Sequence, residues 1–208
     1  MEFPENGVRM AVFSPGFRGR RRPANPALPP GQYEEHGFPV LTAGPTQRIR
    51  LDDWRLTLSI AMGEERTWTW SQLMDLGPER IETDLHCVTS WSKFGTSWRG
   101  VSVDRLLDGV ETDAPYVMAG SYGGYTTNLP LEDLTGGKAW IAFEYDGQPL
   151  AAEHGGPARL LVPHLYLWKS AKWVNSLRLM QRNTDGFWES LGYHEHGDPW
   201  REQRYRSA

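Results

Sequence analysis

The sequence contains a single cysteine, Cys87, among its 208 residues. One thiol cannot form a disulfide within the chain, so Cys87 must be a core residue, a nucleophile, a metal ligand or a link to another chain. Long apolar stretches are missing too, since no uninterrupted one approaches the roughly 18 residues of a membrane-spanning helix. The formal net charge of −4 gives no sign of the basic surface typical of nucleic-acid binding. We therefore expect a soluble protein with no membrane span and no nucleic-acid partner.

The N-terminal residues also lack the pattern of an export signal. The arginines at positions 18 and 20–22 would need an apolar stretch after them, but residues 23–30 are rich in proline. Together with the scarcity of cysteine, this favours a cytoplasmic protein. Prolines, glycines and arginines in residues 1–32 predict an N-terminal extension, either docked as an extended arm or mobile. The body is expected to be one domain over residues 33–208.

Aromatic residues, in contrast, are abundant. They make up 12% of the chain and include ten tryptophans, which indicates a thick core or an enclosed pocket with aromatic walls. Hydrophobic residues account for 39%, enough to bury a sizeable core in a chain of this length.

Short strands dominate the pattern of the body. Apolar and polar side chains alternate over residues 54–60, which is typical of a half-buried strand. Runs bounded by glycine and proline predict further strands at residues 67–70, 80–88, 116–120, 139–145, 159–162 and 173–180. Three brief helical elements are expected: one capped by Ser71, one over residues 103–107 capped by Ser102, and one turn at residues 131–134. The pattern predicts a β-rich α+β domain.

Cys87 lies where the strand predicted at residues 80–88 breaks into small polar residues. A free cysteine most often serves as inert core packing. The neighbours favour a reactive thiol instead, because His86 can lower its pKa and the hydroxyls of Thr89 and Ser92 can donate to a thiolate.

A second stretch combines a tight backbone with cations. His154, two glycines and a proline precede Arg159, and Lys169 and Lys172 follow shortly after. An arginine fork and lysine charges near exposed backbone amides suit a phosphate or another delocalised anion. The alternative is a solvated charged edge beside a turn.

Five blocks in register resemble the sulfite oxidase family of molybdopterin oxidoreductases. The blocks are HCVT at residues 86–89, WRGV at 98–101, AFEYDGQPL at 142–150, HGGPAR at 154–159 and KSAKWV at 169–174. They follow the family's order at similar spacing, from about residue 38 to residue 180. The short length is similar to that of the compact, single-domain prokaryotic members.

The resemblance implies the family's β-rich molybdopterin-binding fold and a single pyranopterin dithiolene carrying molybdenum. It also implies that the Cys87 thiolate is the protein's metal ligand, which agrees with the preference of such a centre for soft sulfur. By position it implies the following cofactor-binding residues: Leu41, Thr42, Cys87, Ser121, His154, Arg159, Lys169, Ser170, Ala171 and Lys172. The cations among them would hold the phosphate of the pterin.

Departures from the family concern the substrate. Sulfite oxidases hold the sulfite dianion with arginines that would fall near Leu41 and near Trp91 or Ser92, and these positions are neutral here. A cavity without such cations binds a small dianion poorly. The resemblance implies two-electron oxygen-atom transfer: the reduced metal takes an oxo group from a substrate such as a sulfoxide or N-oxide, or the oxidised metal passes one to an acceptor. The neutral positions argue against sulfite as the substrate.

The resemblance also implies catalytic residues and a partner. Cys87, His86 and Tyr122 are the expected catalytic residues. Further candidates for the substrate side are Trp91, Trp98 and Tyr125. The haem and dimerisation domains of the large family members have no counterpart in this sequence, so electrons are expected to pass through a separate partner or a soluble carrier.

Two other classes of protein stay open. Cys87 with His86, His154, His194 and His196 could form a zinc or thiol hydrolase, although their spacing matches no known zinc site. The second alternative is a binding module that keeps the fold without catalysis.

Overall fold

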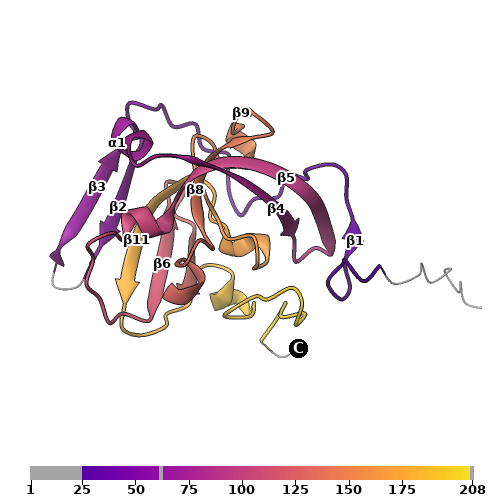
Figure 1. Ribbon diagram of the computed structural model, residues 1–208. Coiled ribbons are helices and arrows are strands. Elements are labelled where there is room, and N and C mark those ends of the chain that lie inside the picture. The colour runs from indigo at the N-terminus through magenta and orange to yellow at the C-terminus, as the bar shows by residue number, and fades with distance from the viewer. Residues whose placement is uncertain (1–24, 61–62, 207–208) are drawn as a thin grey trace, which may run out of the picture.

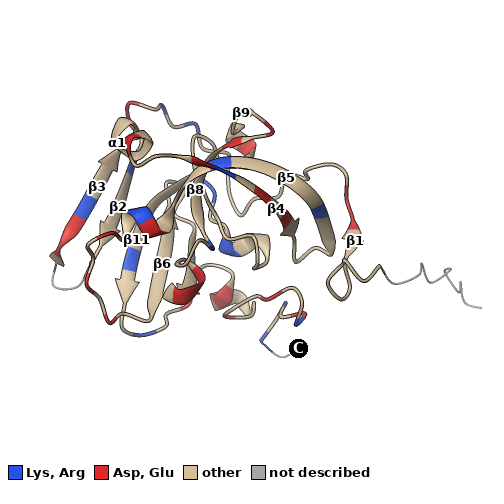
Figure 2. Cartoon of the chain, in the orientation of Figure 1, with Lys and Arg blue, Asp and Glu red and all other residues tan. Residues whose placement is uncertain are grey.

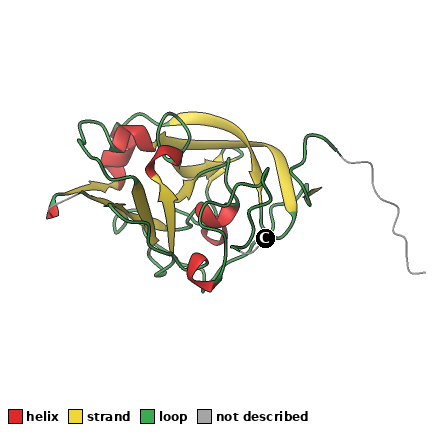
Figure 3. Cartoon of the chain, turned by 90° about the horizontal axis from the view of Figure 1, so that it is seen from below, coloured by secondary structure: helices red, strands yellow, loops and turns green. Residues whose placement is uncertain are grey.

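The computed structural model describes residues 25–60 and 63–206, so most of the expected extension, residues 1–24, lies outside the described residues. Two β-sheets and a few short helices make up the described chain (Figures 1 and 3). This architecture confirms the expected β-rich α+β class. Acidic and basic positions are interspersed over both sheets (Figure 2). In the described ranges no helix is long and apolar enough to span a membrane.

The first sheet contains six strands. Its central order is β1 (Tyr33–Glu34), β5 (Trp91–Ser102), β8 (Trp140–Tyr145) and β10 (Arg159–Leu161), with β4 (Glu79–His86) paired to β5 and β9 (Gln148–Pro149) paired to β8. The antiparallel pair β4 and β5 arches over the molecule in Figure 1 and ends at the turn that contains Cys87. The strand predicted at residues 80–88 is therefore confirmed, with Cys87 directly after its last residue.

The second sheet contains five strands. Their order is β3 (Glu65–Thr69), β2 (Arg55–Ser59), β11 (Val174–Met180), β6 (Tyr116–Ser121) and β7 (Thr126–Pro130). The helices are α1 (Trp70–Asp75) and α2 (Val103–Leu106), with 3-10 turns η2 (Leu131–Asp133), η3 (Ala152–His154), η4 (Leu167–Lys169) and η5 (Glu189–Leu191). Strands β5 and β7 are the two strands of more than two residues that the sequence pattern did not predict.

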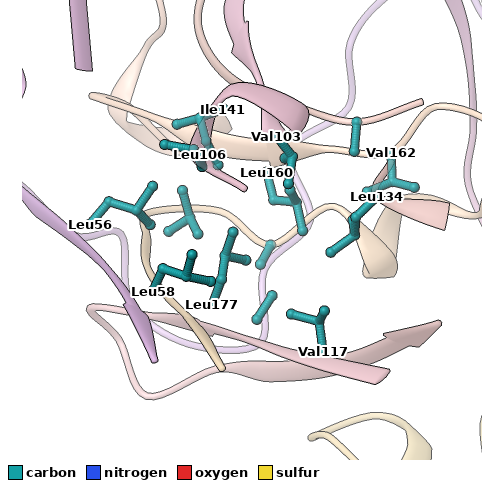
Figure 4. Close-up of a cluster of buried hydrophobic side chains, with 14 of the residues drawn as sticks. Leu56, Leu58, Val103, Leu106, Val117, Leu134, Ile141, Leu160, Val162 and Leu177 are labelled. Atoms are coloured by element: carbon teal, nitrogen blue, oxygen red, sulfur yellow. The ribbon is translucent and has the colours of Figure 1, made fainter. Parts of the chain in front are cut away.

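One hydrophobic core joins the two sheets (Figure 4). Leu56 and Leu58 of β2 and Leu177 of β11 are buried in the same cluster as Ile141 of β8 and Leu160 of β10. Burying each such side chain stabilises the fold by about 1.5–3 kcal/mol. The alternation predicted over residues 54–60 is confirmed, because its apolar face points into this core.

Helix α1 begins earlier than the sequence pattern predicts. Thr69, and not Ser71, is the N-cap: its hydroxyl accepts the backbone N–H of Gln72, and the Gln72 side chain accepts the N–H of Thr69 at 2.8 Å. This reciprocal capping box satisfies two backbone donors, whereas a cap at Ser71 would satisfy one. The Ser102 cap of α2 is confirmed, since its hydroxyl accepts the N–H of Asp104 at 3.2 Å.

Residues 185–206, called here the C-terminal segment, lie below the end of β4 in Figure 1. The guanidinium of Arg204 donates to the carbonyl of Val88, the residue after Cys87. A second anchor is the carboxylate of Asp133, which lies 2.9 Å from His196 of the segment and 2.9 Å from His164 of the body. The C-terminal segment is thereby tied both to the turn at Cys87 and to η2.

Candidate active site

The turn after β4 borders a cavity of about 380 Å³. This volume falls in the range of roughly 300–1,000 Å³ that is typical of sites for small ligands and cofactors. The wall draws on five stretches of the chain, within residues 39–45, 87–91, 123–125, 159–173 and 187–193. Segments that are remote in sequence thus converge on one cavity.

Backbone contacts fix Cys87 at this cavity. Its N–H donates to the carbonyl of Trp91 at 2.8 Å, and the N–H of Ser90 donates to the Cys87 carbonyl at 3.0 Å. Ser90 closes the turn with a positive φ of 74°. The side-chain amide of Gln32 adds a donor to the Cys87 carbonyl at 3.0 Å. The thiol therefore projects from a turn that is held on both sides.

The environment of the thiol is apolar with a few polar contacts. Burial raises the pKa of Cys87, while the Thr89 hydroxyl, which donates to the sulfur at 3.1 Å, and the positive charge of Arg204 act in the opposite direction. A buried thiol of this kind is protonated at neutral pH unless a metal binds the sulfur and displaces the proton. This combination suits a metal ligand better than a free nucleophile.

His86 does not contribute to the thiol's environment as expected. Its side chain is buried beside Ser92, with 2.8 Å between Nδ1 and the hydroxyl oxygen, and it does not line the cavity. Burial lowers the pKa of His86, so the ring is neutral and cannot stabilise a thiolate by charge. The expected lowering of the Cys87 pKa by His86 is therefore wrong.

Two cations face the same cavity as Cys87. Arg159 is 2% exposed and donates to the carbonyls of Ser170 at 2.8 Å and His154 at 3.1 Å. Lys172 donates to the carbonyls of Leu41 at 2.8 Å and Glu153 at 2.6 Å. Within the described chain neither cation has a carboxylate at ion-pair distance.

Burial lowers the pKa of both cations. Burial lowers the pKa of Arg159 to about 10. Burial, aided by the positive charge of Arg159, lowers the pKa of Lys172 to about 8. An anion bound beside both would stabilise their charged forms. The pair therefore fits the phosphate of a cofactor, and the solvated charged edge considered from the sequence does not describe it.

The backbone around these cations is closely packed. Gly155 has a φ of 107°, and a Cβ added there would lie 3.0 Å from Cα of Lys172 and 3.1 Å from Cβ of Arg159. Only glycine accepts both this conformation and this spacing. Ser170, between the two cations in sequence, lines the cavity, and its hydroxyl accepts the N–H of Val162 at 2.9 Å. The HGGPAR motif thus sets the distance between the two cations.

Lys169 takes a different place from the one implied by the family resemblance. Its ammonium is fully buried, lies 2.6 Å from a Glu189 carboxylate oxygen and donates to the carbonyl of Asn128 at 2.6 Å. The side chain does not line the cavity. Lys169 fastens η5 to β7, and the lysine at the cavity is Lys172.

Four further candidate residues lie outside the cavity lining. Tyr122 packs against the main core, where its hydroxyl accepts the N–H of Arg55 at 2.6 Å. The carbonyl of Ala171 accepts the N–H of Leu160 at 2.8 Å. His154 stacks on Phe38 at 4.0 Å between ring centroids. Its Nδ1, like the hydroxyl oxygen of Ser121, is buried without a hydrogen-bond partner among the described residues. Their cofactor or catalytic roles stay predictions.

The remaining candidate residues fall into two groups, those that line the cavity and one that does not. Leu41, Thr42, Trp91 and Tyr125 line the cavity, whereas Trp98 packs in a smaller core cluster. Besides Trp168 and Trp173, the structure adds three aromatic residues of the C-terminal segment that the sequence did not single out as site residues. The three are Phe187, Trp188 and Tyr193. They lie in an irregular segment with no periodicity, and the aromatic richness of the chain was the one signal that pointed toward them.

The described residues do not provide a set of ligands for zinc. In the part of the chain that the structure describes, no group of three or more histidine, cysteine or acidic side chains is arranged to hold a metal ion. Cys87 instead stands as one sulfur at a cavity whose other functional groups are cations. A metal at this site would need most of its ligands from a bound cofactor.

The fold and this site define a molybdopterin-binding oxidoreductase. Residues 43–188 match the family model described as the oxidoreductase molybdopterin binding domain, and the chain belongs to that family. Its cofactor is molybdopterin. The resemblance to the sulfite oxidase family, drawn from five short blocks, is thereby confirmed.

Curated relatives carry oxidoreductase names. The chain is 36% identical over 181 residues to the "Uncharacterized oxidoreductase YuiH" of Bacillus subtilis (strain 168), covering 86% of this chain and 91% of the relative. It is 30% identical over 147 residues to the "Putative protein-methionine-sulfoxide reductase subunit YedZ1" of Azospira oryzae, covering 69% of this chain and 55% of that protein. A catalytic subunit named MsrP, from Pseudomonas syringae pv. tomato, is 25% identical, with 78% of this chain and 53% of the relative covered. The chain therefore spans only about half of the two reductase relatives.

A solved structure shows the same fold. The sulfane dehydrogenase SoxCD from Paracoccus pantotrophus superposes with a TM-score of 0.59 at 20% identity, covering 66% of this chain and 40% of that one.

Proposed function

We propose that this protein is a molybdenum oxidoreductase that carries out two-electron oxygen-atom transfer and reduces a sulfoxide or N-oxide, with the Cys87 thiolate as the protein's metal ligand. For a sulfoxide the balance is one substrate, two electrons and two protons, which give one sulfide and one water. The names of the two reductase relatives support this direction, although they extend well beyond this chain.

A single observation carries the proposal: the only cysteine borders the same cavity as two cations without carboxylate partners. Cys87 would hold the metal, and Arg159 and Lys172 would hold the terminal phosphate of the pterin. When bound, the cofactor supplies the two-electron redox chemistry, while the protein binds, orients and excludes water.

The charges of the wall argue against sulfite as the substrate. Leu41 and Trp91 line the cavity where sulfite oxidases are expected to place arginines. The charged side chains in its lining, apart from the thiol, are Arg159 and Lys172, which the phosphate of the cofactor would occupy. A dianion at the metal would therefore find no further cation in the lining of the cavity.

We also propose a separate electron donor and a cytoplasmic location. The described chain holds no group of side chains that could bind a second metal centre, so a soluble carrier or another protein would supply both electrons. The low cysteine content supports a reducing compartment.

The test is quantification of molybdenum and pterin in the purified protein, followed by reduction of sulfoxides and N-oxides with a reduced viologen as donor. We expect about one metal and one pterin per chain and viologen oxidation with at least one substrate. Cys87→Ser, which preserves the side-chain volume, is expected to lower turnover at least a hundredfold and to retain pterin, because the phosphate anchor is intact. Thr89→Val, which removes only the donor to the sulfur, is the milder comparison.

Three other outcomes of this test would each support a different conclusion. Zinc without pterin would favour a hydrolase. Protein without metal or pterin that binds a partner equally well after Cys87→Ser would favour a binding module. Oxidation of sulfite, with silence across the sulfoxides and N-oxides, would refute the argument from the neutral positions at Leu41 and Trp91.

A further inference from the structure

We propose that the C-terminal segment forms the substrate-facing wall of the cavity and selects a neutral substrate whose sulfur or nitrogen carries an aromatic or bulky apolar group. Trp188 and Tyr193 are the specificity-determining residues. This inference rests on the proposed function and names the class of substrate that the site accepts.

Aromatic rings form a continuous surface on this side of the cavity. Ring centroids lie 5.9 Å apart for Tyr125 and Phe187, 5.0 Å for Phe187 and Trp188, and 5.0 Å for Trp188 and Tyr193. Trp168 closes the row at 5.2 Å from Tyr193. All five residues line the cavity, and three of them belong to the C-terminal segment.

This surface lies near the thiol. Cys87 and Tyr193 line the same cavity. Arg204, further along the same segment, donates to the carbonyl of Val88 next to Cys87. The C-terminal segment therefore covers the end of the cavity at which the metal would be held.

The chemistry of the wall selects against anions. The five aromatic side chains carry no charge, and the negative electrostatic potential over the faces of their rings repels an anion. The two cations of the cavity lining, Arg159 and Lys172, donate to backbone carbonyls and would hold the phosphate of the cofactor. A neutral oxo compound with an aromatic substituent gains from both ring stacking and burial of apolar area.

The wall is preformed. Glu189, between Trp188 and the rest of η5, is fully buried; it pairs with Lys169 and accepts hydrogen bonds from the Thr127 hydroxyl at 2.8 Å and the Trp168 indole N–H at 3.0 Å. Because these contacts hold the segment before substrate arrives, little ordering accompanies binding. Phe187 keeps 39% of its surface exposed, which leaves apolar area for a substrate to cover.

The family match ends at residue 188, so Phe187 and Trp188 lie within it, whereas Tyr193 and the anchors at His196 and Arg204 lie beyond it.

The experiment compares methyl phenyl sulfoxide with dimethyl sulfoxide on the holoenzyme, with reduced viologen as the donor. The wild-type protein is expected to favour the aryl substrate in kcat/KM, and Trp188→Ala is expected to lower that preference at least tenfold, equivalent to about 1.4 kcal/mol. Trp188→Phe should restore most of it, since a ring returns. Leu191→Ala, at an exposed position of the same turn, is the matched control and should leave the preference unchanged.

A binding measurement separates this inference from the proposed function. Methyl phenyl sulfone, which carries the same ring, is titrated into the oxidised holoenzyme by calorimetry; Trp188→Ala should weaken binding at least tenfold, and thermal unfolding checks that the variant is folded. Weaker sulfone binding in the variant, with neither the sulfoxides nor the N-oxides reduced by the wild type, would sustain the wall and overturn the reductase function. An unchanged substrate preference in Trp188→Ala, or no sulfone binding by the wild type, overturns the wall.

Discussion

Replacing Lys169 by methionine separates a structural lysine from a cofactor-binding one. The ammonium is fully buried and pairs with Glu189, so Lys169→Met leaves a carboxylate in the interior with only the donors of Thr127 and Trp168. Removing one partner of a buried ion pair costs about 3–5 kcal/mol. For a chain of this size, 1 kcal/mol shifts Tm by roughly 2–4 °C, so we expect Tm to fall by about 6–20 °C.

The assay is thermal unfolding of protein prepared without cofactor, because bound cofactor would itself raise Tm. Glu189→Gln in the Lys169→Met background is the matched rescue, since an amide keeps the acceptor for Thr127 and Trp168 without a buried charge. We expect it to recover at least half of the loss. Lys172→Met is the contrast: it should lose pterin with a much smaller drop in Tm.

The pterin content of folded Lys169→Met decides the outcome. Retained pterin with a low Tm is the expected result, because the ammonium does not line the cavity. A Tm within 2 °C of the wild type, about 1 kcal/mol or less, together with loss of pterin, would refute the reasoning and restore Lys169 as a cofactor-binding residue.

Two further predictions concern the motif at the cations and the anchor of the C-terminal segment. Gly155→Ala should destabilise the protein by about 1–3 kcal/mol in urea unfolding and reduce its pterin content, because the new methyl group meets Lys172 and the backbone is left-handed; unchanged values would contradict the close packing. Hydrogen bonds and charge from Asp133 raise the pKa of His196, and a hydrogen bond to Gln203 adds to the rise. The contribution of charged His196 to folding stability is therefore complete below the pKa of an unfolded histidine, about 6.5. It declines as the pH rises through the higher pKa of the folded state. The Tm difference between wild type and His196→Gln should therefore shrink from about pH 6 to about pH 8, and a constant difference would exclude a charged His196.

Much of the fold follows from local pattern. The alternation in β2 and the apolar positions of β11 could be predicted because one face of each strand enters the core while the other does not. Strand β5 could not, since rings, glycine and charged residues share both of its faces. Gly100 is needed there by the approach of β8, because a Cβ would lie 2.8 Å from the carbonyl oxygen of Ile141. Such a requirement comes from the partner strand and leaves no local signal.

The site was predictable where a motif defines the chemistry and not where tertiary packing does. Cys87 and Arg159 were found because a lone thiol and a glycine-bounded cation are conspicuous in sequence. Lys169 and Lys172 are three positions apart and chemically alike, and only the fold shows that the first meets Glu189 while the second meets the cavity. The aromatic wall of the C-terminal segment, likewise, depends on how an irregular stretch returns to the sheet.

The turn at Cys87 is held from both directions along the chain. The side-chain amide of Gln32, 55 positions upstream, donates to the Cys87 carbonyl. The guanidinium of Arg204 donates to the Val88 carbonyl from 116 positions downstream. During synthesis Arg204 leaves the ribosome 116 positions after Val88, so the turn at Cys87 forms its contact with Gln32 before its contact with Arg204 is available. The wall of the cavity at this turn is therefore completed only when residues far downstream of the cysteine have folded onto it.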